Sequence, residues 1–133
     1  MRVLALDYGS ARCGCALSDP TGTIVTPIAV VQRPGSRRGL AELTRLVQER
    51  EVERVLVGLP LSLRGEDTQQ TRETRAFAAT LAARLGERIP LELCDERFTT
   101  RIAARFHEPS SSEDSRAAAV LLEDWLAGRC PPG

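Results

Sequence analysis

The first nineteen residues constrain the fold more than any other stretch, because two short apolar runs are separated there by a tight turn. The first run covers residues 3–6 and ends at Asp7, and Tyr8, Gly9 and Ser10 then supply turn chemistry before the second run. This pattern predicts a strand, a turn and a returning strand. A carboxylate at the tip of a buried strand is costly unless a hydrogen-bonded turn or a metal ion takes up its charge. Asp7 is therefore the first candidate functional residue.

Hydrophobic periodicity predicts alternating strands and helices in the rest of the chain. The predicted strands cover residues 2–6, 13–17, 24–31, 52–59 and 90–94. The predicted helices cover residues 38–50, 68–85, 99–106 and 114–126. Short turns join the first three strands, which indicates an antiparallel meander, whereas helical connections lead to the last two strands. We therefore expect an α/β fold with a five-stranded mixed sheet, in which strands four and five lie parallel to strand one and helices flank the sheet.

Length and composition favour one ordinary globular domain. The chain has 133 residues, 42% hydrophobic and 27% charged, and has no apolar run near the roughly 18 residues of a membrane span. We expect one domain over residues 1–127, a disordered tail over 128–133, and a cytoplasmic protein without a signal peptide or membrane partner. The four cysteines are expected to be free thiols, buried as small hydrophobic side chains. They are Cys13, Cys15, Cys94 and Cys130.

The formal net charge of the chain is zero, but all eighteen of its basic residues are arginine. Arginine binds phosphate with a planar fork, so the distribution of arginines matters more than their sum. One cluster surrounds a Pro-Gly turn (Arg33, Arg37 and Arg38), and another flanks a polar segment (Arg64, Arg72 and Arg75). Each cluster is either a local phosphate-binding patch or a solvated surface.

Three carboxylates are candidates for one metal site. Asp7 and Glu96 each follow a predicted parallel strand, and such strand ends share the sheet edge where ligands bind. Asp114, at the predicted start of the last helix, could be a third ligand. Hard oxygen ligands suit Mg²⁺ or Mn²⁺, and one or two such ions can catalyse hydrolysis of a phosphodiester.

Each acid also has a structural interpretation. Asp7 could accept hydrogen bonds from its turn, Glu96 could pair with Arg97, and Asp114 could be a helix N-cap. The three acids taken together favour the metal site.

Four ordered sequence blocks resemble the YqgF family of Holliday-junction-resolvase-like proteins. The blocks read LDYGSARCGCALSD, VGLPLSLRGEDTQQTRETRAFA, DERFTT and DSRAAAVLL, and the resemblance runs from Arg2 to about Leu126. It implies an RNase H-like fold and a divalent-metal nuclease that processes the 5′ end of precursor 16S ribosomal RNA. Resolution of branched recombination junctions is an older attribution to the same family.

The resemblance also assigns roles to particular residues. It implies that Asp7, Glu96 and Asp114 are the catalytic carboxylates and the ligands of one or two Mg²⁺ or Mn²⁺ ions. It matches Gly58, Leu59 and Pro60 to the family's strand-end turn. The residues expected to contact substrate are Gly9, Arg12, Arg64 and Arg97.

One segment departs from the family pattern. Residues 107–113 are short, serine-rich and slightly acidic, whereas family members have a longer basic segment there, whose loss removes phosphate contacts. An RNA-binding ribosome-assembly factor without catalysis is therefore an alternative to the nuclease. A phosphate-binding loop of the sugar-kinase and actin kind is a third interpretation. The expected partner is structured RNA or branched DNA, with the protein a monomer or a homodimer.

Overall fold

The computed structural model describes residues 1–96 and 111–130. Its strands are β1 (Val3–Tyr8), β2 (Arg12–Ser18), β3 (Val25–Gln32), β4 (Arg54–Leu59) and β5 (Leu91–Asp95). Its helices are α1 (Arg37–Glu49), α2 (Gln69–Leu85) and α4 (Ser111–Leu126). The eight predicted elements within these residues are all confirmed, with shifts of a few residues at their ends. The predicted helix over residues 99–106 lies outside the described residues.

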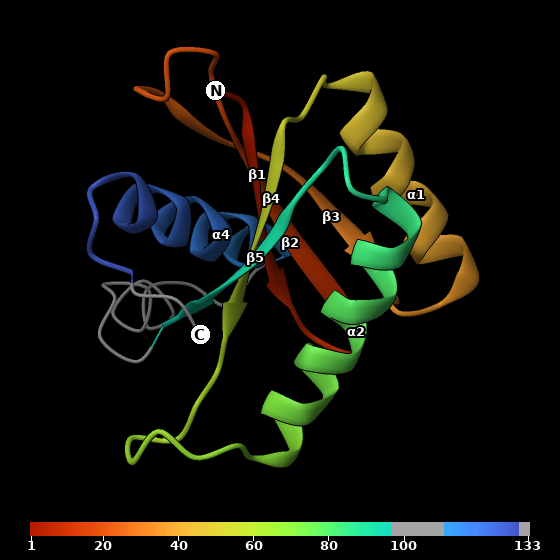
Figure 1. Ribbon diagram of the computed structural model, residues 1–133, viewed down its shortest axis with the longest axis vertical. Coiled ribbons are helices and arrows are strands. Elements are labelled where there is room, and N and C mark those ends of the chain that lie inside the picture. The colour runs from red at the N-terminus through yellow and green to blue at the C-terminus, as the bar shows by residue number, and fades with distance from the viewer. Residues whose placement is uncertain (97–110, 131–133) are drawn as a thin grey trace.

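The five strands form one mixed sheet in the order β3-β2-β1-β4-β5. β1 pairs antiparallel with β2, and β2 pairs antiparallel with β3. β4 is parallel to β1, and β5 is parallel to β4 (Figure 1). This is the predicted arrangement, and it brings the carboxyl ends of β1, β4 and β5 to one edge of the sheet.

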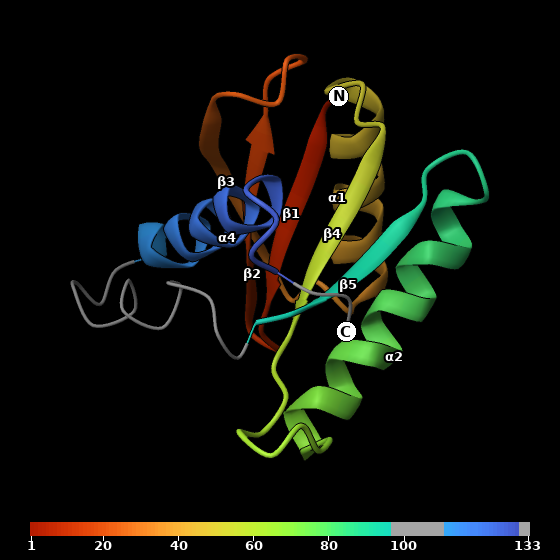
Figure 2. The same cartoon turned by 60° about the vertical axis from the view of Figure 1, so that its left-hand side comes forward.

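Helices cover both faces of the sheet (Figure 2). α1 and α2 lie on one face, where Leu43, Phe77 and Leu81 pack against alternate residues of β1 such as Leu4 and Leu6. Among the described helices, only α4 lies on the other face. There Leu121 and Leu122 pack against Val3, Ala5 and Leu56. The two hydrophobic cores are thus separated by the sheet.

Local signals explain where the two helices after β3 and β4 begin and end. The Ser36 hydroxyl accepts a hydrogen bond from the backbone N–H of Gly39 at 3.0 Å, and so caps α1. Thr68 and Thr71 form a reciprocal capping box at the start of α2. Gly86 ends α2 with φ of 76°, a left-handed value that glycine adopts without strain.

The cysteines divide into two pairs. Cys13 and Cys15 are free and buried, as predicted. Cys15 and burial together hold the pKa of the Cys13 thiol well above its usual value. Cys94 and Cys130 are joined in a disulfide, which the prediction of four free thiols missed because their approach depends on the tertiary fold.

The end of the chain is also more ordered than its composition predicts. Cys130 is buried, and its disulfide sulfur lies 3.4 Å from the backbone oxygen of Asp95. The structure therefore differs from the expected disordered tail at residues 128–130, because Cys130 packs against the end of β5. Residues 131–133 lie outside the described part of the chain.

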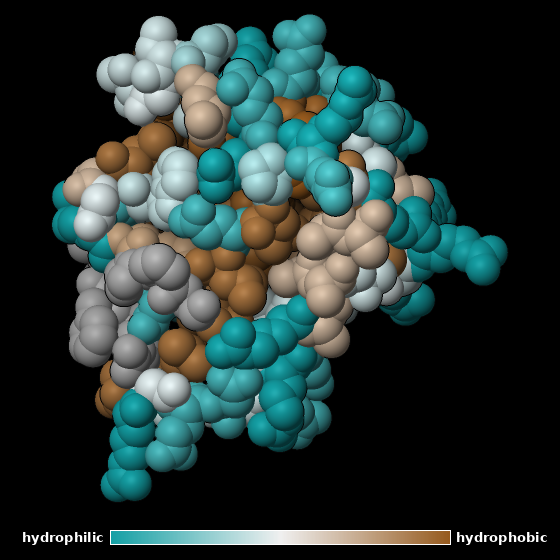
Figure 3. Space-filling view, viewed as in Figure 1, coloured by the Kyte–Doolittle hydropathy of each residue, from teal (hydrophilic) through white to brown (hydrophobic). Residues whose placement is uncertain are grey.

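One face of the surface is shown in Figure 3. In Figure 3, hydrophilic residues project at the top and bottom of the view, and hydrophobic residues reach the surface near its centre. In the described part of the chain, no helix combines the length and the apolar character that crossing a membrane would require.

Candidate active site

Asp7 lies inside β1 rather than beyond its end. The strand continues to Tyr8, and Asp7 is 7% exposed. Side chains alternate between the faces of a strand, so Asp7 lies on the same face as Val3 and Ala5, which pack against α4. Asp7 thus lies within the sheet, on the α4 face, and not in the turn itself.

Gly14 connects Asp7 with the start of α4. It is the residue directly opposite Asp7 in the β1–β2 pair. A Cβ atom at Gly14 would overlap the backbone carbonyl of Asp114. Only a glycine allows the first turn of α4 to lie this close to β2. The close approach places Asp114 at the level of Asp7 on the same face of the sheet.

Gly58 likewise leaves the space that Glu96 needs to approach the sheet. It lies within β4, whereas the sequence assigns it to a strand-end turn, and the chain leaves the strand only at Pro60. A Cβ atom at Gly58 would overlap the Oε2 atom of Glu96 and would lie 2.9 Å from Cδ2 of Leu121 on α4. The carboxylate of Glu96, which is 6% exposed, therefore lies over Gly58 on the α4 face.

The strand register brings these groups together. Leu6 of β1 is opposite Val57 of β4, so Asp7 and Gly58 are the next residues along the two parallel strands. The Glu96 carboxylate lies over Gly58 and the Asp114 backbone lies over Gly14, so these two residues are positioned over the strands on either side of Asp7. All three acids thus lie on one face of the sheet, at one edge, which we call the acidic edge.

Asp114 forms an ion pair with Arg12. The Nε atom of Arg12 lies 2.7 Å from Oδ2 of Asp114, and the two side chains are 51% and 29% exposed. α4 begins at Ser111, so Asp114 belongs to the first turn and the N-cap interpretation is wrong. Arg12, expected to contact substrate, is placed beside the third carboxylate.

The donor set fits a hard divalent cation in its chemistry, since it consists of three carboxylates. Within residues 1–96 and 111–130, however, no three His, Cys, Asp or Glu side chains are grouped closely enough to hold one ion. Like charges at one edge repel each other when no cation bridges them. The ion pair with Arg12 accounts for the charge of Asp114 in this arrangement.

The remaining predicted contact residues are more dispersed. Arg64 is exposed in the connection between β4 and α2. Gly9 closes the β1–β2 turn, where a Cβ atom would lie 2.9 Å from the backbone oxygen of Arg12. Gly9 therefore has a structural reason to be glycine, and its contact with phosphate stays a prediction. Arg97 lies outside the described residues.

Sequence reasoning missed Gly14 altogether and placed Gly58 in a turn. A signal for both was present, because a glycine inside an apolar strand often marks the close approach of another chain segment. The signal does not say which segment approaches, and here the partners are 100 and 38 residues further along the chain, at Asp114 and Glu96.

The fold and the acidic edge define an RNase H-like α/β protein with a carboxylate site at the ends of parallel strands. Two solved structures share this fold. RuvC of Thermus thermophilus in complex with a Holliday junction substrate superimposes with a TM-score of 0.62 at 16% identity, covering 100% of both chains. The fowlpox virus Holliday junction resolvase bound to junction DNA gives a TM-score of 0.55 at 10% identity, covering 95% of this chain and 99% of the resolvase.

Sequence comparison identifies the family. A family model described as "RuvX: Holliday junction resolvase" matches residues 1–128. A protein of Maridesulfovibrio salexigens named "Putative pre-16S rRNA nuclease" is 38% identical, over 96% of this chain and 98% of its own. A protein of the same name from Anaeromyxobacter sp. strain Fw109-5 is 40% identical, over 97% and 98%. The chain belongs to the RuvX family of resolvase-like nucleases, which confirms the resemblance to YqgF.

Proposed function

We propose that this protein is a divalent-metal-dependent endonuclease that processes the 5′ end of precursor 16S ribosomal RNA. One observation carries the proposal: Asp7, Glu96 and Asp114 come from three separate elements to one face and one edge of the sheet. Carboxylates that share one edge of a sheet repel each other, and a bridging cation would offset that repulsion. The names of the full-length relatives support the choice of substrate.

The residues of this protein would hold and orient the metal ion and the substrate rather than react themselves. Asp7, Glu96 and Asp114 would hold Mg²⁺ or Mn²⁺, which lowers the pKa of bound water and stabilises the departing oxygen. Asp7 is held by the β1–β2 and β1–β4 pairs, so its carboxylate is oriented before substrate arrives. Gly58 leaves the space that the Glu96 carboxylate occupies. Arg12 is placed to neutralise a substrate phosphate beside Asp114.

The decisive test is Asp7→Asn. The substitution keeps the size of the side chain but removes a negative charge, so we expect cleavage of a precursor rRNA fragment in Mn²⁺ to fall by more than about 100-fold, because even partners of metal ligands cost 10–100-fold. The melting temperature should stay nearly constant. Glu87→Gln is the matched control, since Glu87 is exposed in the connection before β5, away from the acidic edge. Equal cleavage by Asp7→Asn and wild type would refute the assignment.

Branched DNA is a second candidate substrate, favoured by the description of the family as a Holliday junction resolvase. A four-way junction assayed beside the rRNA fragment, with and without Mn²⁺, separates the two. Tight RNA binding without any metal-dependent product would instead favour the assembly-factor alternative.

A further inference from the structure

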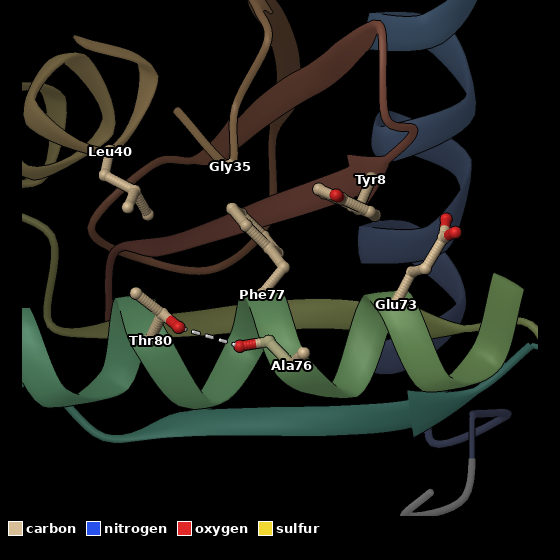
Figure 4. Close-up of a pocket in the computed structure, with 7 residues that line it drawn as sticks. All are labelled: Tyr8, Gly35, Leu40, Glu73, Ala76, Phe77 and Thr80. Atoms are coloured by element: carbon tan, nitrogen blue, oxygen red, sulfur yellow. Dashed lines mark hydrogen bonds between the residues drawn. The ribbon is translucent and has the colours of Figure 1, made fainter. Parts of the chain in front are cut away.

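A concave site lies on the opposite face of the sheet from the three carboxylates. It is a cavity of about 280 Å³ between the end of β1, the β3–α1 connection, α1 and α2 (Figure 4). Its lining includes Tyr8, Gly35, Leu40, Glu73 and Phe77. Small-molecule pockets usually measure about 300–1,000 Å³, so this one suits a small planar group rather than a large ligand.

The cavity presents an aromatic ring. Tyr8 and Phe77 are stacked, with ring centroids 4.3 Å apart and planes inclined by 22°. Phe77 is buried, whereas Tyr8 is half-buried and retains accessible surface. Phe77 thus supports Tyr8 from α2, as Figure 4 shows. Aromatic rings held in this way are platforms on which unpaired nucleobases stack.

Two polar groups accompany the ring. The Glu73 carboxylate accepts one hydrogen bond, from Nε2 of Gln69 at 3.3 Å, and keeps further acceptor capacity. The Tyr8 hydroxyl is hydrogen-bonded to no group in the described part of the chain. Burial and the nearby Glu73 carboxylate raise the pKa of Tyr8, and a tyrosine hydroxyl keeps its proton at neutral pH. The cavity therefore offers an acceptor-only carboxylate and a hydroxyl donor.

The cavity lies at the same edge of the sheet as the three carboxylates, but on the other face. Tyr8 directly follows Asp7 on β1, and the two side chains point to opposite faces of the sheet at the same edge. Arg33 lies in the adjoining β3–α1 connection and Arg37 and Arg38 lie in the first turn of α1, and none of the three is ion-paired with a described residue. Phosphates beside the cavity would therefore meet uncommitted guanidinium groups.

We propose that this cavity binds one unpaired guanine of the RNA, next to the nucleotide at the acidic edge. The inference rests on the proposed nuclease function. Guanine presents two adjacent N–H donors on its Watson–Crick edge, which complement a carboxylate, and a carbonyl oxygen that can accept from a tyrosine hydroxyl. Adenine presents an acceptor where guanine presents a donor, so the carboxylate disfavours it. Arg33 and Arg38 contact the phosphates flanking the bound base.

The test uses the full chain and needs no cleavage. We expect guanosine monophosphate to shift the amide resonances of Tyr8, Gly35 and Phe77 in a two-dimensional NMR spectrum, at concentrations at least five-fold below those needed for adenosine monophosphate. Glu73→Gln should remove this preference, whereas Glu87→Gln should preserve it. Shifts confined to other residues, or an unchanged preference in Glu73→Gln, would overturn the proposal.

A cleavage assay then separates this proposal from the nuclease assignment. Replacing the unpaired guanines near the cut by adenine, one at a time, should slow wild-type cleavage at one position by about ten-fold and leave Glu73→Gln unaffected. Normal cleavage with no guanine dependence would overturn the pocket and leave the nuclease intact. Guanosine binding without any cleavage would overturn the nuclease assignment, while the pocket would stand as a nucleotide site.

Discussion

Under the proposed function, Arg12 has two partners at the acidic edge: the Asp114 carboxylate and a substrate phosphate. It pairs with Asp114 at 2.7 Å, and the guanidinium supplies a positive charge where a metal ion would also be attracted. Because both side chains are partly exposed, the ion pair is weak, on the order of 0–1 kcal/mol. Under the proposed function, a divalent cation would displace Arg12 from Asp114, and Arg12 would then be available to a substrate phosphate.

This competition predicts the effect of Arg12→Met. Removing the guanidinium frees Asp114, so Mn²⁺ should bind about two- to five-fold more tightly by calorimetry, the range that a weak surface ion pair supports. RNA binding should weaken at the same time, because one phosphate contact is lost. Arg88→Met, at an exposed residue far from the edge, should change neither affinity. Unchanged Mn²⁺ affinity in Arg12→Met would show that Arg12 does not compete with the ion.

At the level of elements, the site depends on how closely α4 lies against β2. Ala118 and Ala119 of α4 pack on Ala16, and Gly14 lies under the first turn of the helix. Small residues on both elements permit this close packing. The helix brings Asp114 to the edge only because no side chain intervenes at Gly14.

Gly14→Ala should therefore affect both stability and the site. The added Cβ would overlap the Asp114 backbone, so α4 must shift, at a cost of about 1–3 kcal/mol in the free energy of unfolding. Urea denaturation measures the loss, and Mn²⁺ affinity should fall with it. Gly35→Ala is the control, because its Cβ would meet only the Tyr8 hydroxyl, at an ordinary 3.6 Å. If the two variants were equally stable, the close packing of α4 would not be needed.

At the level of the whole molecule, the pair Cys94 and Cys130 ties the last residues of the described chain to β5. Their Cα atoms are 5.8 Å apart and 36 residues separate them. The loop closed by this link contains residues 97–110 and the whole of α4. The link thus restrains the segment that carries Asp114 relative to the strand that precedes Glu96.

The link predicts the outcome of thiol titration. Protein unfolded without reductant should show two reactive thiols, those of Cys13 and Cys15, and four after reduction. Cys130→Ser should lower the melting temperature relative to wild type in the absence of reductant, because the unfolded chain is no longer constrained. With reductant the two proteins should unfold more nearly alike. Four reactive thiols in the unreduced protein would contradict the pairing.

Local patterns were sufficient to predict the elements and their order. Apolar runs bounded by Gly, Pro and Asp mark all five strands, and short connections distinguish the meander from the parallel strands. Asp7 and Glu96 were identified as candidates from the same reasoning, since each comes at the end of a parallel strand. The N-cap alternative for Asp114 was wrong, because the start of a helix depends on neighbours that the local sequence does not reveal.

The sequence by itself thus determined the secondary structure and the sheet topology of the described residues, and it singled out Asp7, Glu96 and Asp114 as candidates for one site. Only the tertiary structure decided how that site is assembled: Glu96 over Gly58, Asp114 over Gly14 and Arg12 on Asp114. The same holds for the pairing of Cys94 with Cys130 and for the cavity beside Tyr8. Periodicity and turn chemistry act over a few residues, whereas these contacts join residues far apart in the chain, and packing alone selects them.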